Sequence, residues 1–507
     1  MKTRGQKALI NTLTLGIYQV VYFVCGLILP RYILTYFGST YNGVVSSITR
    51  FLGFISILNM GIAGPTRVAL YKALAESNQD RISGIVNATQ RYMRKVGCVL
   101  LLYIGAMVFV YPCLANTEIP NTEIALLVLI LGAQSFATYF FGITYQILLT
   151  ADQRQYVHNL ITTVATVLNV VIAVLLMKSG CNIFAVKLGS MVVFVLSPIT
   201  LAIYVKRKYQ INAKVPQDKT ALKGRWDAMW HSLANIVHNG VHSVALTIFV
   251  DVKLLSVYSV YYLVINGLYQ ILTIFTSSLE AAFGNMLAKK EIKLAYKNLE
   301  TYEYFVYTFV SLVFSCTLVL IVPFVKVYTA GITDVNYSMP VFACIAVVAQ
   351  MIMCIRQPYL SMVQAAGHYK QTRNGAFTEA ILNVLITFAL TPVLGLVGAA
   401  LGMLFANTFR TVQYMVYLRK NIVFRPIRKP LLMLVWTAAN TIVVVLICQY
   451  VLRFFSMASW TGWIVAGVVC FAISFVVNLI SSLIFCKRKL LTFICTFKNI
   501  LVKRKKG

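Results

Sequence analysis

Apolar runs recur along the whole chain, and short polar segments separate them. Each run contains about 18 to 28 residues, enough to cross about 30 Å of hydrocarbon as a helix. The pattern therefore predicts an all-α polytopic membrane protein with about fourteen transmembrane helices. The predicted spans are residues 9–36, 43–70, 96–112, 124–150, 159–177, 183–205, 229–250, 256–286, 304–326, 338–365, 375–391, 395–418, 430–452 and 461–486.

Two distant segments are nearly the same, which indicates an internal repeat. Tyr145–Ala151 aligns with Tyr359–Ala365, 214 positions later, and Leu168–Val170 aligns with Leu382–Val384. A long repeat with an even number of spans in each copy predicts two pseudo-symmetric six-helix bundles, related as parallel repeats. The predicted divisions are an N-terminal bundle at 1–210, a cytoplasmic linker at 211–228, a C-terminal bundle at 229–420, an extra helix pair at 421–486 and a basic cytoplasmic tail at 487–507.

Composition and charge agree with a membrane protein. Hydrophobic residues make up 59% of the chain and charged residues 12%, so a soluble domain would lack the polar surface that it needs. The net charge of +31 comes mostly from lysines and arginines in alternate connections, which predicts that these connections and both termini are cytoplasmic. Because the cations are spread over many short loops, they favour membrane lipids and exclude nucleic acid as a partner.

Three predicted helices carry polar side chains every three or four residues, which places them on one helix face. In the predicted helix 256–286 this face runs almost the whole length of the span. It favours a water-filled cavity, although polar side chains also join helices to one another. The candidate cavity-lining residues are Asn11, Thr14, Tyr18, Tyr22, Asn235, His238, His242, Tyr262, Asn266, Gln270, Thr273 and Ser277.

Charged side chains inside the spans indicate the chemistry of the substrate. Arg50, Arg356 and Arg410 lie deep in predicted helices, about 12 to 16 Å from the nearer interface. Two intramembrane acids, Glu280 and Glu379, stand against them, so the cavity should have a positive potential. Arginine binds phosphate through paired hydrogen bonds, and we therefore expect the three arginines to bind a substrate pyrophosphate.

Titratable groups in the same helices are candidates for ion coupling. They are Glu280, Glu379 and His238, and the coupling ion is either H⁺ or Na⁺. His238 and His242 have the i, i+4 spacing of metal ligands, but no HExxH pattern accompanies them, so no metal site is predicted. The sequence has no GxxxxGKS or GxxxxGKT loop, so we expect no cofactor and no direct use of ATP.

Several short motifs are specific when they are taken together. They are Phe37–Gly38 through Tyr41–Gly43, Gly61–Lys72, Ser277–Ala288, Arg356–Pro358, Ala366–Tyr369, and Glu379–Asn383 running into Gly395–Gly402. With them the chain resembles the bacterial polysaccharide repeat-unit flippases (Wzx type, for O-antigen or capsule) of the multidrug, oligosaccharidyl-lipid and polysaccharide exporter superfamily. The resemblance implies a multi-pass protein of the bacterial cytoplasmic membrane. It also implies alternating-access transport of an undecaprenyl-pyrophosphate-linked oligosaccharide, without catalysis.

The resemblance also implies partners and alternatives. The partners would be the lipid-linked oligosaccharide, membrane lipids and other polysaccharide-assembly proteins. Lipid II flippases are relatives with arginines in the first, second and eighth helices, whereas here Arg50 is in the second predicted helix and the eighth has no arginine. A lipid II flippase and a multidrug or small-solute antiporter on the same fold are the alternatives. An enzyme is disfavoured, because the sequence shows no large outer loop and no clustered carboxylates.

Overall fold

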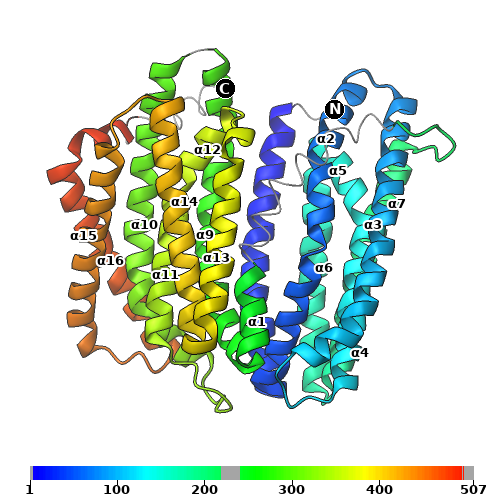
Figure 1. Cartoon of the computed structure of the whole chain (residues 1–507), viewed down its shortest axis with the longest axis horizontal. Helices are drawn as coiled ribbons and strands as arrows, with labels where there is room; N and C mark the ends of the chain where they lie inside the picture. Colours follow the sequence, from blue (N-terminus) through cyan, green and yellow to red (C-terminus); the bar gives the residue numbers. More distant parts are fainter. Residues whose placement is uncertain (1–3, 219–239, 290, 494, 496–507) are drawn as a thin grey trace. The chain divides into compact units, whose positions relative to one another are not determined.

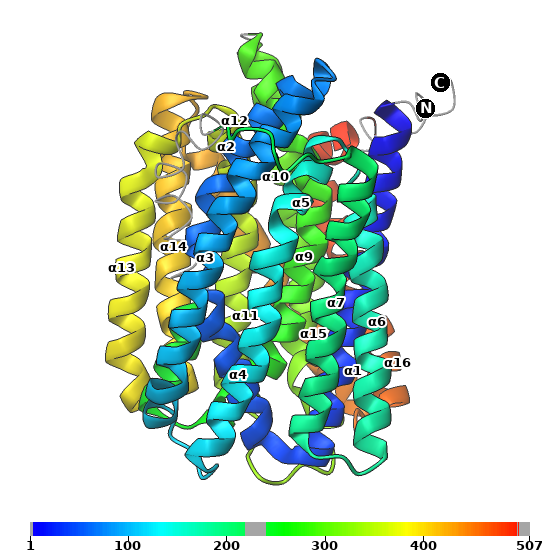
Figure 2. The same ribbon diagram turned by 90° about the vertical axis from the view of Figure 1, so that its right-hand side faces the viewer.

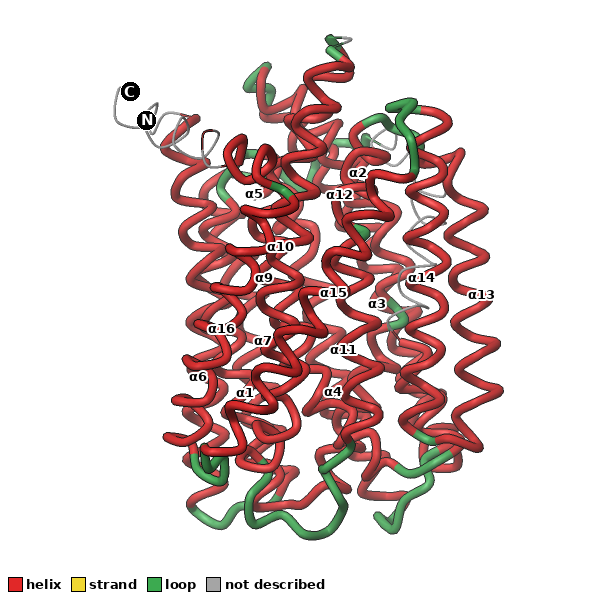
Figure 3. The backbone as a smooth tube through the Cα atoms, turned by 90° about the vertical axis from the view of Figure 1, so that its left-hand side faces the viewer, coloured by secondary structure: helices red, strands yellow, loops and turns green. Residues whose placement is uncertain are grey.

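The computed structural model describes residues 4–218, 240–289, 291–493 and 495. Every regular element in these ranges is helical, as Figure 3 shows. Eleven of the described helices are long and apolar enough to cross a membrane. The predicted class, an all-α polytopic membrane protein, is therefore confirmed.

The chain divides into two compact units. Unit 1 is Met1–Ser259 with Ile332–Val335, and unit 2 is Val260–Gly331 with Asn336–Gly507. The helices of unit 1 are α1 (Arg4–Gly53), α2 (Ser56–Ala75), α3 (Gln79–Leu114), α4 (Asn121–Ala137), the π-helix η1 (Thr138–Gly142), α5 (Ile143–Ala151), α6 (Gln155–Lys178), α7 (Ile183–Tyr209) and the apolar helix Gly240–Phe249.

The helix α9 (Val252–Ala288) starts in unit 1 and continues in unit 2. The other elements of unit 2 are α10 (Ile292–Tyr328), α11 (Pro340–Ile355), α12 (Gln357–Ala365), α13 (Tyr369–Leu394), α14 (Leu396–Asn421), α15 (Arg428–Val451), the 3₁₀ turn η3 (Leu452–Phe454) and α16 (Trp460–Phe485). The predicted boundaries of the bundles, the linker and the tail stay predictions.

Three predicted spans are not among the eleven apolar helices of the described chain, and each has a local cause. The span 43–70 is divided, because α1 continues into it and α2 begins after a break. The span 229–250 begins outside the described residues, which include only Gly240–Phe249 of its helix. The span 395–418 corresponds to α14, a complete helix whose polar and charged side chains lower its mean hydropathy.

A glycine lets α1 bend without ending. Gly38 has a φ of +77°, which residues with a Cβ rarely adopt, so the turn expected between residues 36 and 43 is a kink inside α1. Asp334, from the loop after α10, stabilises this kink. Its carboxylate accepts hydrogen bonds from the backbone N–H of Ser39 (2.6 Å) and from the Ser39 hydroxyl (2.7 Å). The carboxylate thus satisfies a backbone donor that the kink leaves without a helical partner.

The start of the second repeat packs within unit 1. The Asn42 amide donates a hydrogen bond of 2.7 Å to the Ser256 hydroxyl, and both residues are buried. Gly43 approaches Val252 so closely that a Cβ at position 43 would lie 1.9 Å from the Val252 carbonyl oxygen. Asn42 and Ser256 are 214 positions apart, so they are equivalent in the two repeats. Two residues that are equivalent in the repeats therefore contact each other inside unit 1.

The order of the helices repeats as the sequence predicts. Within unit 1, α6 packs against α1 and α7, as Figure 2 shows, and α4 is followed by η1 and α5. Within unit 2, α11 is interrupted at Arg356 and followed by α12. Gly142, the last residue of η1, and Arg356 are again 214 positions apart. Both copies therefore depart from regular α-helix at an equivalent position.

Close helix pairs organise unit 2. α14 packs against α13 and α11, and α10 packs against α15 and α16 (Figure 1). Glycines bring α13 and α14 together: a Cβ at Gly398 would lie 2.4 Å from the Leu390 carbonyl carbon, and one at Gly402 would lie 2.0 Å from the Thr387 hydroxyl oxygen. Small residues at such contacts let membrane helices approach closely.

Replacing Gly398 with alanine tests this packing. The new methyl group would overlap the backbone of α13, so we expect a loss of about 1–3 kcal/mol in stability. Thermal unfolding of the purified protein, followed by fluorescence-detected size-exclusion chromatography, measures the loss. Gly105→Ala is the control, because no atom lies within 4 Å of a Cβ there. Equal effects of the two substitutions would contradict the packing.

Candidate functional site

Three charged side chains, Arg356, Glu379 and Arg410, meet inside unit 2, and we call them the ionic cluster. Arg356 joins α11 to α12, Glu379 is on α13, and Arg410 is on α14. Each lies about 14 to 17 Å from the same side of the unit, counted along its helix from the C-termini of α12 and α14 and the N-terminus of α13. The cluster is therefore at bilayer depth, where an isolated charge is costly.

The break between α11 and α12 places Arg356 in the cluster. Pro358 has no backbone N–H and cannot donate the hydrogen bond that would continue α11. The Arg356 carbonyl oxygen accepts hydrogen bonds from the backbone N–H groups of Tyr359 (3.1 Å) and Leu360 (3.0 Å), which begins α12. Arg356 is 7% exposed, and its Nη1 donates a hydrogen bond of 2.6 Å to Glu379 Oε1.

Arg410 shares the same carboxylate. Its Nε lies 3.4 Å from Glu379 Oε2, and the residue is only 2% exposed. Nη1 donates to the Thr372 carbonyl oxygen (3.1 Å) and to Gln413 Oε1, and Nη2 donates to the Tyr414 hydroxyl (2.6 Å). The guanidinium carbon also lies 4.1 Å from the centre of the Tyr414 ring, a cation–π contact. These contacts hold Arg410 in one position.

Among the residues that the structure describes, the ionic cluster has one positive charge in excess. Two guanidinium groups, which stay protonated in proteins, face the single carboxylate of Glu379. Arg356 Nε is buried and has no hydrogen-bond partner in the described part of the chain. Next to it, the Gln357 amide donates to the Tyr269 hydroxyl of α9 (3.0 Å). The cluster therefore has both the charge and the donor capacity to bind a further anion.

A second buried ion pair in unit 2 has balanced charges. Arg425, between α14 and α15, forms two hydrogen bonds with the carboxylate of Glu303 on α10. Burial lowers the pKa of Arg425, but the hydrogen bonds and the charge of Glu303 raise it by more, so the guanidinium stays charged. One arginine meets one carboxylate here. This pair can join α10 to the α14–α15 loop without any other ion.

The ionic cluster has no counterpart in the first repeat. When the two repeats are aligned, the equivalent positions are Gly142, Ala165 and Ser197. None of these residues is charged, although the helices that carry them follow the same order. The repeated order of the helices therefore does not require these charges.

The structure brings together two of the three arginines that the sequence suggests for phosphate binding. Arg356 and Arg410 both contact Glu379, which the sequence suggests only as an ion-coupling residue. The third, Arg50, is half-buried in the last turn of α1, in unit 1. A phosphate-binding role for the three arginines stays a prediction.

Part of the polar face of α1 joins helices within unit 1. The Asn11 amide donates to the Gln153 carbonyl oxygen (3.0 Å), and its Oδ1 accepts from the Tyr156 backbone N–H (2.8 Å). The Asn159 amide donates to the Thr14 hydroxyl (3.4 Å). These contacts are the alternative role that the sequence allowed for polar residues in helices.

The other predicted cavity-lining residues differ in exposure. His242 is buried, with its ring stacked on Tyr258. Tyr22 is exposed, and the half-buried members of the set are Tyr18, Tyr262, Asn266, Gln270 and Thr273. Asn235 and His238 lie outside the described residues, as do the side chains of Ser277 and Glu280. A role in lining a cavity stays a prediction for the whole set.

Sequence reasoning missed the residues that hold Arg410. Gln413 and Tyr414 follow it at i+3 and i+4, so helical periodicity alone places them on the same face of α14. Thr372 contributes only a backbone carbonyl oxygen, which no side-chain pattern reveals. Gly375 makes room for this arrangement, because a Cβ there would lie 1.7 Å from Gln413 Nε2.

The chain has a fold known from membrane transporters. It is similar to the lipid II flippase MurJ in an inward closed conformation, with a TM-score of 0.73 and 13% identity, covering 95% of this chain and 100% of that chain. It is also similar to an inward-facing multidrug resistance MATE family transporter of the MOP superfamily, with a TM-score of 0.55 and 13% identity, covering 81% and 96% of the two chains.

A third similar structure is a MATE in complex with MaL6, with a TM-score of 0.56 and 13% identity, covering 84% of this chain and 97% of that chain. No protein-family model and no curated protein matches the sequence. The chain is thus a multi-pass membrane protein with the fold shared by MurJ and MATE transporters. At these identities, the similarity defines the fold alone.

Glu379→Gln tests whether the cluster depends on its carboxylate. The substitution leaves two buried guanidinium groups without a counter-charge, so we expect a loss of about 3–5 kcal/mol in stability. Thermal unfolding measures the loss. Glu76→Gln is the control, because Glu76 forms a largely exposed ion pair with Arg81 (3.1 Å), which contributes about 0–1 kcal/mol.

A double variant tests whether the loss of stability comes from the unbalanced charge. Glu379→Gln combined with Arg356→Met removes one charge of each sign, so it should recover part of the stability that Glu379→Gln loses. If Glu379→Gln unfolds at the same temperature as Glu76→Gln, the ionic cluster is not electrostatically coupled.

Proposed function

We propose that the protein is a flippase that moves an undecaprenyl-pyrophosphate-linked oligosaccharide repeat unit across the bacterial cytoplasmic membrane. It would work by alternating access, for surface polysaccharide assembly, with both termini in the cytoplasm and with no catalytic step. The observation that carries the proposal is the positive charge left over in the ionic cluster, at bilayer depth in a chain with a transporter fold.

The excess positive charge of the ionic cluster favours an anionic substrate. An organic cation would be repelled by the cluster, whereas a pyrophosphate offers several oxygen atoms that accept hydrogen bonds from guanidinium groups. The buried Nε of Arg356 is a donor that such an oxygen would satisfy. A lipid-linked pyrophosphate also explains why the charges lie at bilayer depth, since its polar part must pass there while its polyprenyl chain stays in lipid.

Glu379 would couple substrate binding to a proton. Without substrate, its carboxylate occupies arginine donors that a pyrophosphate would need. Protonation would remove its negative charge and release both guanidinium groups to the substrate.

The extent of the fold similarity supports a lipid carrier over a drug exporter. The similarity to the lipid II flippase covers 95% of this chain, whereas the similarity to the two MATE structures covers 81% and 84%. The same observation makes a lipid II flippase the second candidate. An antiporter of organic cations is a weaker candidate, because the ionic cluster has the wrong sign for its substrate.

Alternating access requires the two repeats to move about their common axis. The contact between Asn42 and Ser256 joins equivalent residues of the two repeats, and Gly43 brings the backbones together beside it. If both termini are cytoplasmic, this contact is near the outer face of the membrane. It would then close the outer side in one state and separate in the other.

Arg356→Lys tests the phosphate site. Lysine keeps the charge but lacks the planar set of donors, so transport should fall about 10- to 100-fold, as expected when a charged hydrogen bond of about 1.5–3 kcal/mol is lost. The measurement is transfer of a fluorescent undecaprenyl-pyrophosphate oligosaccharide across vesicles that contain the purified protein. The matched control is Arg373→Lys, an exposed position on α13.

The same assay with other candidate substrates identifies the transported molecule. Faster transfer of lipid II than of the oligosaccharide repeat unit would move the assignment to the second candidate. Efflux of an organic cation by the wild-type protein, with no lipid transfer, would replace both by an antiporter. Equal transfer by Arg356→Lys and Arg373→Lys would remove Arg356 from the phosphate site.

Crosslinking tests the contact between Asn42 and Ser256. Asn42→Cys combined with Ser256→Cys, in a chain whose exposed native cysteines are serine, should react with a short cleavable bis-thiosulfonate. Crosslinking should stop transfer, and reduction should restore it, because the two segments must separate in each cycle. Unchanged transfer by the crosslinked protein would exclude movement at this contact. Each single-cysteine variant, treated in the same way, is the control.

A further inference from the structure

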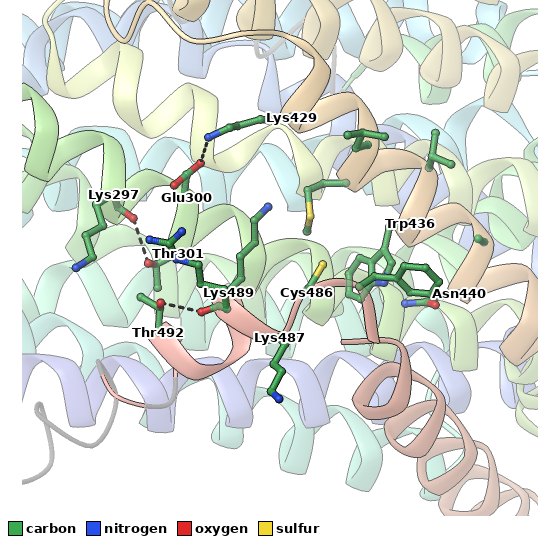
Figure 4. A pocket seen from close by; sticks show the side chains of 16 residues that line it. Lys297, Glu300, Thr301, Lys429, Trp436, Asn440, Cys486, Lys487, Lys489 and Thr492 are labelled. Atoms are coloured by element: carbon green, nitrogen blue, oxygen red, sulfur yellow. Dashed lines mark hydrogen bonds and ion pairs between the residues drawn. The ribbon is translucent and has the colours of Figure 1, made fainter. Parts of the chain in front are cut away.

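A pocket of about 940 Å³ opens at the ends of three helices in unit 2 (Figure 4). Its walls are the beginning of α10, the first turns of α15, the end of α16 and the helical turns that follow α16. None of the three residues of the ionic cluster lines it. The pocket is therefore a separate candidate site.

One side of the pocket is strongly basic. Its charged lining residues are Lys297, Glu300, Lys429, Lys487, Arg488 and Lys489. Lys429 forms an ion pair of 2.8 Å with Glu300, the single acid of this lining, and also donates to the Tyr296 hydroxyl. The described residues thus balance one cation and leave four, which creates a positive potential inside the pocket.

The other side of the pocket is apolar. Trp436 lies across the pocket from Lys297, as Figure 4 shows. Leu432 and Val435 on α15 and Phe485 at the end of α16 are further apolar lining residues. Trp436 Nε1 is buried and has no hydrogen-bond partner in the described chain. Tryptophan prefers the level where hydrocarbon meets head groups, because its ring is apolar and its N–H needs an acceptor. The pocket therefore lies at one interface of the membrane.

We propose that this pocket binds one anionic phospholipid of the surrounding leaflet. The head-group phosphate would lie between Lys297 and Lys489, an ester oxygen would accept from Trp436 Nε1, and an acyl chain would follow the wall of Trp436 and Phe485. Basic pockets between helix ends are suited to such head groups. A small soluble anion would leave the apolar wall without a partner.

The bound lipid has a structural consequence of its own. It would connect α10 to α15 and α16, the pair that follows the second repeat, and would add to the ion pair of Lys429 with Glu300. The proposal does not depend on the flipped substrate. A protein that transports normally but does not retain the phospholipid would overturn this inference and leave the proposed function intact.

The test uses the full-length protein in nanodiscs that contain equal amounts of phosphatidylglycerol and phosphatidylcholine. The protein is transferred to detergent, and native mass spectrometry counts the phospholipids that stay bound. We expect one phosphatidylglycerol per protein. Lys297→Gln with Lys489→Gln should weaken its retention about 25-fold, because each lysine near a lipid surface contributes a factor of about five.

The matched control is Lys206→Gln with Lys370→Gln, which removes the same charge from two exposed positions outside the pocket. Retention by the control, together with loss in the pocket variant, supports the site. Equal retention by both variants, or equal retention of the two phospholipids, contradicts it. Displacement of phosphatidylglycerol by millimolar inorganic phosphate would mean a soluble-anion site, and preferential displacement by undecaprenyl pyrophosphate would mean a substrate site. Either result would overturn the phospholipid assignment.

Discussion

The constraint that governs unit 2 is that two arginines share one carboxylate at bilayer depth. A buried guanidinium group is stable only beside an anion, and Glu379 supplies one anion for Arg356 and Arg410. Three helices therefore have to meet at one point, and the broken helix α11–α12 is part of that meeting. Two positive charges thus face one negative charge, and the proposed function uses this excess to bind an anionic substrate. In that proposal the same three side chains serve both stability and substrate binding.

Comparison of the two repeats shows which interactions occur in both copies of the fold. Arg154 and His368 are 214 positions apart, and they interact with Tyr204 and Tyr417, which also align with each other. Asn169 and Asn383 are likewise equivalent and buried. These features recur because both copies make the same turns and packing contacts. The charges of the ionic cluster do not recur at the equivalent positions of the first repeat. The candidate site is therefore asymmetric, although the order of the helices repeats.

Much of the fold is predictable from the sequence, because a bilayer requires long apolar helices and the repeat gives their order. The kink at Gly38 is not predictable in this way, since its partner Asp334 is 295 positions from Ser39. The candidate site is predictable from the sequence only in part. Depth identifies Arg356, Arg410 and Glu379 as unusual, but Glu379 is 23 positions from Arg356, and only the packing of α11, α12 and α13 against α14 brings the three side chains together.

The bond between Asp334 and the kink of α1 has a consequence for biosynthesis. The chain leaves the ribosome from its N-terminus, so α1 is made long before the loop that carries Asp334. The helix Gly240–Phe249 and the first residues of α9 also arrive late, although they belong to unit 1. Unit 1 therefore cannot finish folding when its first helices enter the membrane. The kink of α1 lacks its hydrogen bonds to Asp334 until most of the polypeptide has been translated.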